Sequence, residues 1–109
     1  MYVVVANPTF THTVNVLVPS DGGHDKQTLR ATFRVLPSDK ESEFDISTIE
    51  GSNGFLRAII VELLDLVDAK EQPVPYSDKL RDQLFALPFI RTALVKTYFD
   101  AIRKAAEGN

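Results

Sequence analysis

The chain of 109 residues contains no cysteine and no tryptophan. The lack of cysteine excludes disulfide bonds and thiolate metal ligands, and it is typical of proteins in a reducing compartment. No apolar run reaches the length of about 18 residues that a transmembrane helix needs. The first ten residues, MYVVVANPTF, lack the basic start and long apolar core of a secretory signal peptide. We therefore expect an intracellular protein with no membrane partner.

Basic residues are not in excess, since the formal net charge is -3. Nucleic-acid binding needs Lys and Arg clustered on one face, because each contact neutralises a phosphate. The basic residues between positions 91 and 104 are interrupted by Asp100, so we expect them to form a solvated helix face. No nucleic-acid partner is predicted.

Side chains that could hold a metal or carry catalysis are few. The turn DGGHD brings Asp21, His24 and Asp25 together, but a glycine turn offers no fixed frame for three or four ligands. His12 on a strand face is more typical of a structural residue than of a catalytic base. Nothing marks one serine as a nucleophile, and SDGGHD has the spacing of neither a P-loop nor a dinucleotide fingerprint. We predict no catalytic, cofactor-binding or metal-binding residue, and an enzyme is the least favoured class.

Two segments alternate between apolar and polar residues, as half-buried strands do. In HTVNVLV the valines at 14, 16 and 18 share one face, and in QTLRATFRVL Leu29, Ala31, Phe33 and Val35 do the same. The glycines of PSDGGHDK supply a turn between them. We predict an antiparallel hairpin with one wet face of threonine and arginine. The segment YVVVA at the start fits a further strand, although five residues decide little.

A wide apolar helix is predicted from Asn53 to Val67, because the apolar residues of NGFLRAIIVELLDLV cover nearly half of a helical cylinder. Such coverage is typical of a helix that packs on two sides, with Ser52 or Asn53 as its N-cap. Before it, residues 37–52 form a polar, acidic connector that fits either a loop or a short irregular helix.

The prolines of EQPVPYSDKLRDQLFALPF set the boundaries of the C-terminal part. Pro73 and Pro75 exclude helix and fix an extended arm. Ser77 is a natural N-cap for a helix that buries Leu80, Leu84 and Leu87. Pro88 breaks this helix and begins the next one, which ends near Ala106 with Gly108 as its C-cap. The fold class is therefore α+β in a single domain, with a β-hairpin region (1–36), a connector (37–52) and a helical region (53–109) in which an αα-hairpin follows the central helix.

The last helix carries more apolar surface than a core contact needs. Its apolar arc spans roughly 180°, whereas about 100° suffices to reach a core. One interpretation is that a small domain buries all of these side chains. The other is an exposed apolar patch for self-association or partner capture, bordered by Phe85, Phe89, Arg91, Val95 and Phe99. An unpaired edge of the hairpin would also favour an oligomer that continues the sheet.

The order of these segments resembles the tail assembly chaperones of long-tailed bacteriophages and prophages. The likeness covers most of the chain: a Val-rich hairpin with ATFRVLP, the segment GFLRAIIVELLDLVD, an arm with Pro73, Pro75 and Ser77, an LP corner and a closing ALVKTYFDAI helix. The likeness rests on the order and spacing of these segments, since none of the motifs is specific by itself. Members commonly have a tryptophan near the end of the central helix and a glycine before the arm, where this chain has leucines and Glu71.

The resemblance implies a non-enzymatic protein that holds the long, apolar, helical tape-measure protein soluble until tail tube protein polymerises around it. It also implies self-association, a place in the cytoplasm of the bacterial host, and absence from the mature virion. Two other classes stay open. One is a minor tail or connector component that remains in the particle, and the other is a small host adaptor that docks through the hairpin edge.

Overall fold

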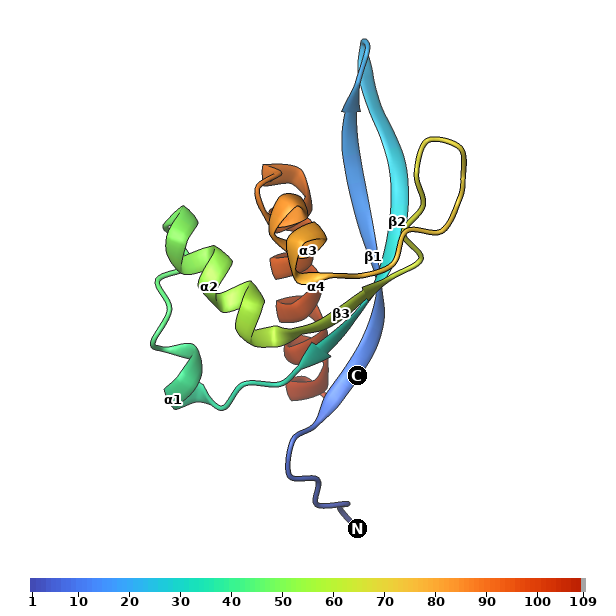
Figure 1. Ribbon diagram of the computed structural model, residues 1–109. Helices are drawn as coiled ribbons and strands as arrows, with labels where there is room; N and C mark the ends of the chain where they lie inside the picture. The colour runs from blue at the N-terminus through green and yellow to red at the C-terminus, as the bar shows by residue number, and fades with distance from the viewer. Residues whose placement is uncertain (109) are drawn as a thin grey trace.

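The predicted hairpin forms two long strands of an antiparallel sheet. In the computed structural model, which describes residues 1–108, β1 (Thr9–Ser20) pairs with β2 (Gly23–Arg34) without a break in register. Val14 and Val16 of β1 and Leu29, Ala31 and Phe33 of β2 are buried on one face. The hairpin extends well beyond the helices (Figure 1), and its predicted alternation is confirmed.

A third strand stands where the sequence predicted the second half of the central helix. Helix α2 spans Ile49–Ile59, and the chain then runs as β3 (Ile60–Leu64) along β2, which gives the strand order β1-β2-β3. The prediction of one helix from Asn53 to Val67 is therefore wrong after Ile59. The reason is tertiary: consecutive β-branched residues favour strand, and β2 offers them a hydrogen-bonding partner. A pair of strands alone is marginal in water, so β3 also stabilises the hairpin.

The N-terminal segment and the connector also differ from the expectation. Residues 2–6, the candidate extra strand, pair with no other strand within residues 1–108. The connector holds the short helix α1 (Ser38–Glu41), and α2 begins inside it. Its N-cap is Thr48, whose hydroxyl accepts from the Gly51 N–H at 3.0 Å; the predicted caps Ser52 and Asn53 lie one turn further along. The boundary at 52/53 therefore falls inside α2, and the region 53–109 is not wholly helical.

The predicted αα-hairpin consists of α3 (Asp78–Phe85) and α4 (Pro88–Ala106). The Ser77 hydroxyl accepts from the Leu80 N–H at 3.1 Å, as an N-cap does. Pro88 occupies the first turn of α4. Gly108 has a φ of 76° just past the helix end, which is the left-handed C-cap conformation expected there. Asn109 lies outside the described residues.

An aromatic cluster joins α4 to the sheet. Tyr98 is fully buried, and its ring lies 5.7 Å from Phe33 of β2 and 5.5 Å from Phe55 of α2, measured between centroids. Its hydroxyl accepts from the Leu36 N–H at 3.1 Å. Burial raises the pKa of the Tyr98 phenol, which keeps it neutral. One side chain therefore connects α4, α2 and the end of β2, and the helices cover one face of the sheet only (Figure 1).

The other face of the sheet is polar, as the sequence predicted. The hydroxyls of Thr11 and Thr32 lie 2.8 Å apart across β1 and β2. Arg30 Nε donates to Asp65 Oδ2 at 2.7 Å, which ties β2 to the residue after β3. This hydrogen bond from Arg30 lowers the pKa of the Asp65 carboxyl. Asp65 also has a φ of 63°, a left-handed conformation that Asp and Asn tolerate better than most residues.

Replacing Tyr98 with Phe tests the hydroxyl at the centre of the fold. The Leu36 N–H would lose its partner, so we expect the free energy of unfolding to fall by about 1–2 kcal/mol. Urea unfolding measures the change, with Tyr2→Phe as the control because Tyr2 is exposed. A Tyr98→Phe protein as stable as the control would contradict this role.

The Arg30–Asp65 pair predicts a pH dependence of stability. Because the folded pKa of Asp65 lies below its unfolded value, near 3.9, its stabilising contribution is present above that value and is lost as the pH falls through the folded pKa. Asp65→Asn keeps the tolerance for a positive φ but removes the charge. We expect the melting temperature of this variant to fall less steeply than that of wild type below about pH 5. If the melting temperatures of wild type and Asp65→Asn fell with pH at the same slope over the acidic range, the Arg30–Asp65 pair would contribute nothing to stability.

Candidate functional site

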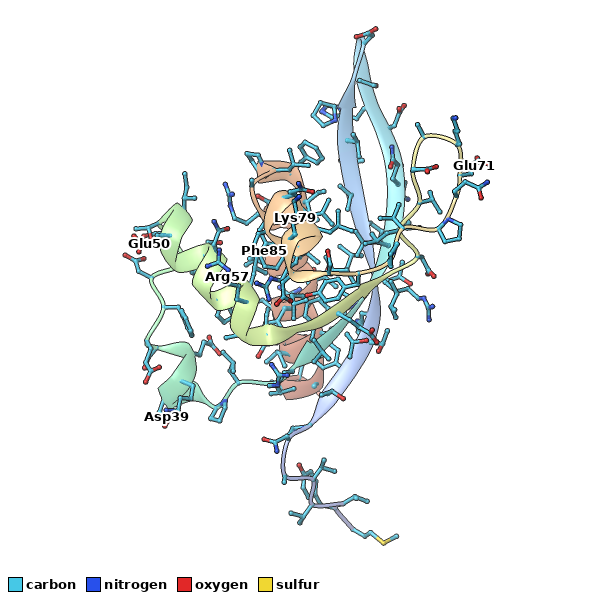
Figure 2. All side chains as sticks on the ribbon, in the orientation of Figure 1. Asp39, Glu50, Arg57, Glu71, Lys79 and Phe85 are labelled. Atoms are coloured by element: carbon cyan, nitrogen blue, oxygen red, sulfur yellow. The ribbon has the colours of Figure 1, made fainter. Side chains whose placement is uncertain are left out.

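Phe85 does not belong to any exposed patch. It is 1% exposed and lies in the core, and Figure 2 labels it beside α3, on the side of that helix that faces α2 in this view. The sequence assigned the buried stripe of this helix to Leu80, Leu84 and Leu87 instead, but none of the three is fully buried, and only Leu84 packs against the core. The two leucines inside α3 are half-buried, and Leu87 is exposed at the cap of α4. Phe85 is therefore the fully buried side chain of α3.

Three of the predicted residues lie along one groove beside α4. Arg91 and Val95 line a cleft of about 340 Å³ with Ile46 and Ile49 of the segment that leads into α2. Phe99 and Ile46 line the adjoining cleft, of about 300 Å³, which reaches α1. We call these two joined clefts the α4 groove. Val95 and Phe99 are half-buried and pack against the core, while Ile46 and Ile49 are exposed.

The α4 groove is bounded on one side by a hydrogen-bonded turn at Asp45. Ser47 donates to Asp45 Oδ1 through its N–H at 3.0 Å and through its hydroxyl at 2.5 Å. These two bonds, the hydroxyl foremost, lower the pKa of the Asp45 carboxyl. The Thr48 hydroxyl donates to the Asp45 carbonyl at 2.9 Å while it caps α2. The turn therefore fixes the backbone on both sides of Ile46 and places Ile49 in the first turn of α2.

Arg91 has a structural contact inside the predicted patch. Its Nη1 donates to the carbonyl of Phe85 at 2.9 Å, and this carbonyl belongs to the last residue of α3. A carbonyl at a helix C-terminus has no partner within the helix and carries partial negative charge, so a guanidinium stabilises it. Arg91 thus holds the corner between α3 and α4 while it lines the α4 groove.

Phe89 lies in a different cleft. With Ala93 of the same helix it faces Asn15 and Leu17 of β1 across a shallow depression of about 390 Å³. The structure therefore divides the five predicted residues three ways. Arg91, Val95 and Phe99 line the α4 groove, Phe89 lines the cleft beside β1, and Phe85 is in the core.

Ile46 and Ile49 are the groove residues that the sequence reading missed. The sequence placed both in the polar connector and gave them no part in the predicted patch. The sequence could have shown their position only if the N-cap at Thr48 had been recognised, since Asp45, Ser47 and Thr48 all have side chains typical of turns and caps.

Basic and acidic side chains border the groove. Lys96 lines it and pairs with Asp100, with 2.6 Å between Nζ and Oδ2. The hydrogen bond from Lys96 is the main cause that lowers the pKa of the Asp100 carboxyl. Glu41 of α1 lines the other end of the groove. The groove is thus suited to an amphipathic segment whose apolar side chains enter it and whose polar side chains meet its border.

Within residues 1–108, no three His, Cys, Asp or Glu side chains converge as metal ligands. In the same part of the chain, no helix has the length and apolar character needed to cross a membrane. Comparison with protein-family models, with curated proteins and with solved structures finds no significant match to this chain.

Two glycines of α2 form a matched test of the turn beside the groove. A Cβ at Gly51 would lie 1.9 Å from the Asp45 carbonyl oxygen, whereas a Cβ at Gly54 would meet only two ring carbons of Phe44, each at 3.3 Å. We expect Gly51→Ala to reduce the free energy of unfolding by at least about 2 kcal/mol, because backbone must move. Gly54→Ala should stay within about 1 kcal/mol of wild type, because the gain in helix propensity offsets a small shift of the Phe44 ring.

Chemical denaturation of both variants measures the difference. Equal stabilities would mean that the Asp45 carbonyl does not lie against α2, and the described wall of the groove would then be wrong.

Proposed function

We propose that this chain is a tail assembly chaperone of a long-tailed phage or prophage. It binds apolar helical segments of the tape-measure protein in the α4 groove and keeps that protein soluble until tail tube protein polymerises around it. The observation that carries the proposal is the pair of exposed isoleucines, Ile46 and Ile49, beside the half-buried Val95 and Phe99. The order of segments that resembles this family supports it from the side of the sequence.

The free energy of this binding would come from the burial of apolar side chains that the folded chain leaves exposed to solvent. Ile49 is 67% exposed, and burying an isoleucine side chain fully contributes about 1.5–3 kcal/mol. A helix laid along α4 would contact such residues through side chains spaced by three or four positions. Several weak apolar contacts of this kind suit a chaperone, because its partner has to be released when the tail tube assembles.

The same proposal implies where the protein acts and whether it needs a cofactor or a catalytic step. A tail assembly chaperone acts in the cytoplasm of the bacterial host, associates with itself, uses no cofactor and leaves before the virion is mature. No step of catalysis is required, because holding and releasing an apolar helix needs only differential binding.

A minor tail or connector component is the second candidate. The observation that favours it is the long hairpin, whose outer edge on β1 is unpaired within the described residues. Protein subunits that stay in a particle commonly use such edges for permanent contacts. Detection of the chain in purified virions would support this candidate over the chaperone.

Co-expression with the longest helical protein encoded beside this chain tests the chaperone function. We expect wild type to keep that partner in the soluble fraction and the double variant Ile49→Glu, Val95→Glu to reduce its soluble amount several-fold, because two buried carboxylates are costly in an apolar contact. Val67→Glu is the matched control, since Val67 is 57% exposed and lies beyond β3, away from the groove.

Circular dichroism and thermal melting establish that each variant is folded. A partner that stays insoluble with wild type would contradict the chaperone function. A partner rescued equally by wild type and by the folded double variant would place the binding surface outside the α4 groove.

A further inference from the structure

The N-terminal segment is apolar and has no partner in the described chain. Residues 1–5 are MYVVV, and each of these five residues is more than half exposed to solvent. Figure 1 shows this segment leaving the start of β1 and extending away from the sheet. Within residues 1–108, no hydrogen bond joins residues 1–7 to the rest of the chain. We call residues 2–6, YVVVA, the N-terminal arm; β-branched and aromatic residues of this kind favour strands.

The outer edge of β1 offers backbone groups to which such an arm could bind. The Val35 N–H donates to the Pro8 carbonyl, and the register from Thr9 to Ser20 is unbroken. In an antiparallel pair the residues alternate, so even-numbered residues of β1 bond to β2 and odd-numbered ones turn their N–H and C=O outward. Thr11, Thr13 and Asn15 therefore present an unpaired row along the edge.

This edge lacks the charges that usually protect one. Natural edge strands carry Lys, other charged residues or Pro that discourage pairing with another chain. The twelve residues of β1, TFTHTVNVLVPS, include no Lys, Arg, Asp or Glu, and Pro19 stands only at the far end. The charges of the hairpin are on the central strand instead, where Lys26, Arg30 and Arg34 occur. The edge of β1 is thus left open to a further strand.

An apolar cleft lies directly beside the same edge. Its walls are Asn15 and Leu17 of β1 and Pro88, Phe89, Thr92 and Ala93 of α4. In an extended strand alternate side chains point to opposite sides. A strand added to β1 would therefore direct every second side chain toward Phe89 and Ala93, and valine is a suitable size for a shallow depression.

We propose that the N-terminal arm of one copy pairs as an additional strand with the β1 edge of a second copy. The two copies exchange arms reciprocally, since each has one arm and one free edge, and a two-fold dimer satisfies both. The arm and the edge within one chain are less suited to each other, because Asn7 and Pro8 join them directly and Pro8 already belongs to the ladder with β2. The dimer concerns self-association only and does not rest on the proposed binding of a tape-measure protein.

Sedimentation velocity across the micromolar range tests the exchange with a matched pair of arm variants. Val4→Pro removes an N–H and disfavours the strand, so it should raise the dissociation constant of the dimer roughly tenfold or more. Val4→Thr keeps the β-branched shape and the N–H, and it should stay dimeric. Neither change touches the folded domain, since Val4 is exposed. A wild type that is monomeric throughout, or a Val4→Pro protein that dimerises as wild type does, would overturn the proposal.

Disulfide cross-linking tests which edge receives the arm, because the chain contains no cysteine of its own. One tagged copy carries Val3→Cys, and a second copy with a different tag carries Thr11→Cys, Thr13→Cys or Asn15→Cys. Mild oxidation of the mixture should link the two tags for at least one of these positions and not for the control Val67→Cys, which is exposed beyond β3. A third sample carries both cysteines in one chain. If a link forms within that chain but not between the two tagged copies, the arm folds onto its own edge, and the proposed exchange is wrong.

Discussion

The position of α4 against the sheet is the constraint on which the rest of the structure depends. It is held by the buried ring of Tyr98, which meets aromatic rings from β1, β2 and α2 and accepts a hydrogen bond from Leu36. Aromatic side chains contribute large buried areas and prefer specific mutual angles. With α4 fixed in this way, one flank of the helix faces the connector and forms the α4 groove, and its N-terminal part faces β1 and forms the second cleft.

The structure distributes over two surfaces most of the residues that the sequence had assigned to one patch. The apolar arc of α4 is wider than the core requires, but its excess does not form a single exposed patch. Val95 and Phe99 border a groove completed by Ile46 and Ile49, and Phe89 borders a cleft beside an uncharged strand edge. Under the proposals made above, partner binding would use the α4 groove and self-association the cleft beside β1, so substitutions in one surface would leave the other intact.

The parts of the fold that local chemistry determines could be predicted from the sequence. The alternation of β1 and β2, the cap at Ser77 and the proline that begins α4 depend on neighbouring residues alone, and the structure confirms them. The segment around Ile60 could not be predicted, because its apolar run suits a buried helix and a strand equally, and only the edge of β2 decides between them. Phe85 was misplaced for a related reason: which side chain of a short helix reaches the core depends on the orientation of the whole helix.

Methyl-group NMR of the complex tests most directly whether the partner binds in the α4 groove. Isoleucine, leucine and valine methyl groups of this chain would be labelled and observed with and without a soluble helical fragment of the neighbouring tape-measure candidate. We expect the methyl signals of Ile46, Ile49 and Val95 to shift or broaden together, while that of Leu17 stays in place. Binding that shifts Leu17 and leaves the three groove residues unchanged would contradict the assignment of the partner to the α4 groove.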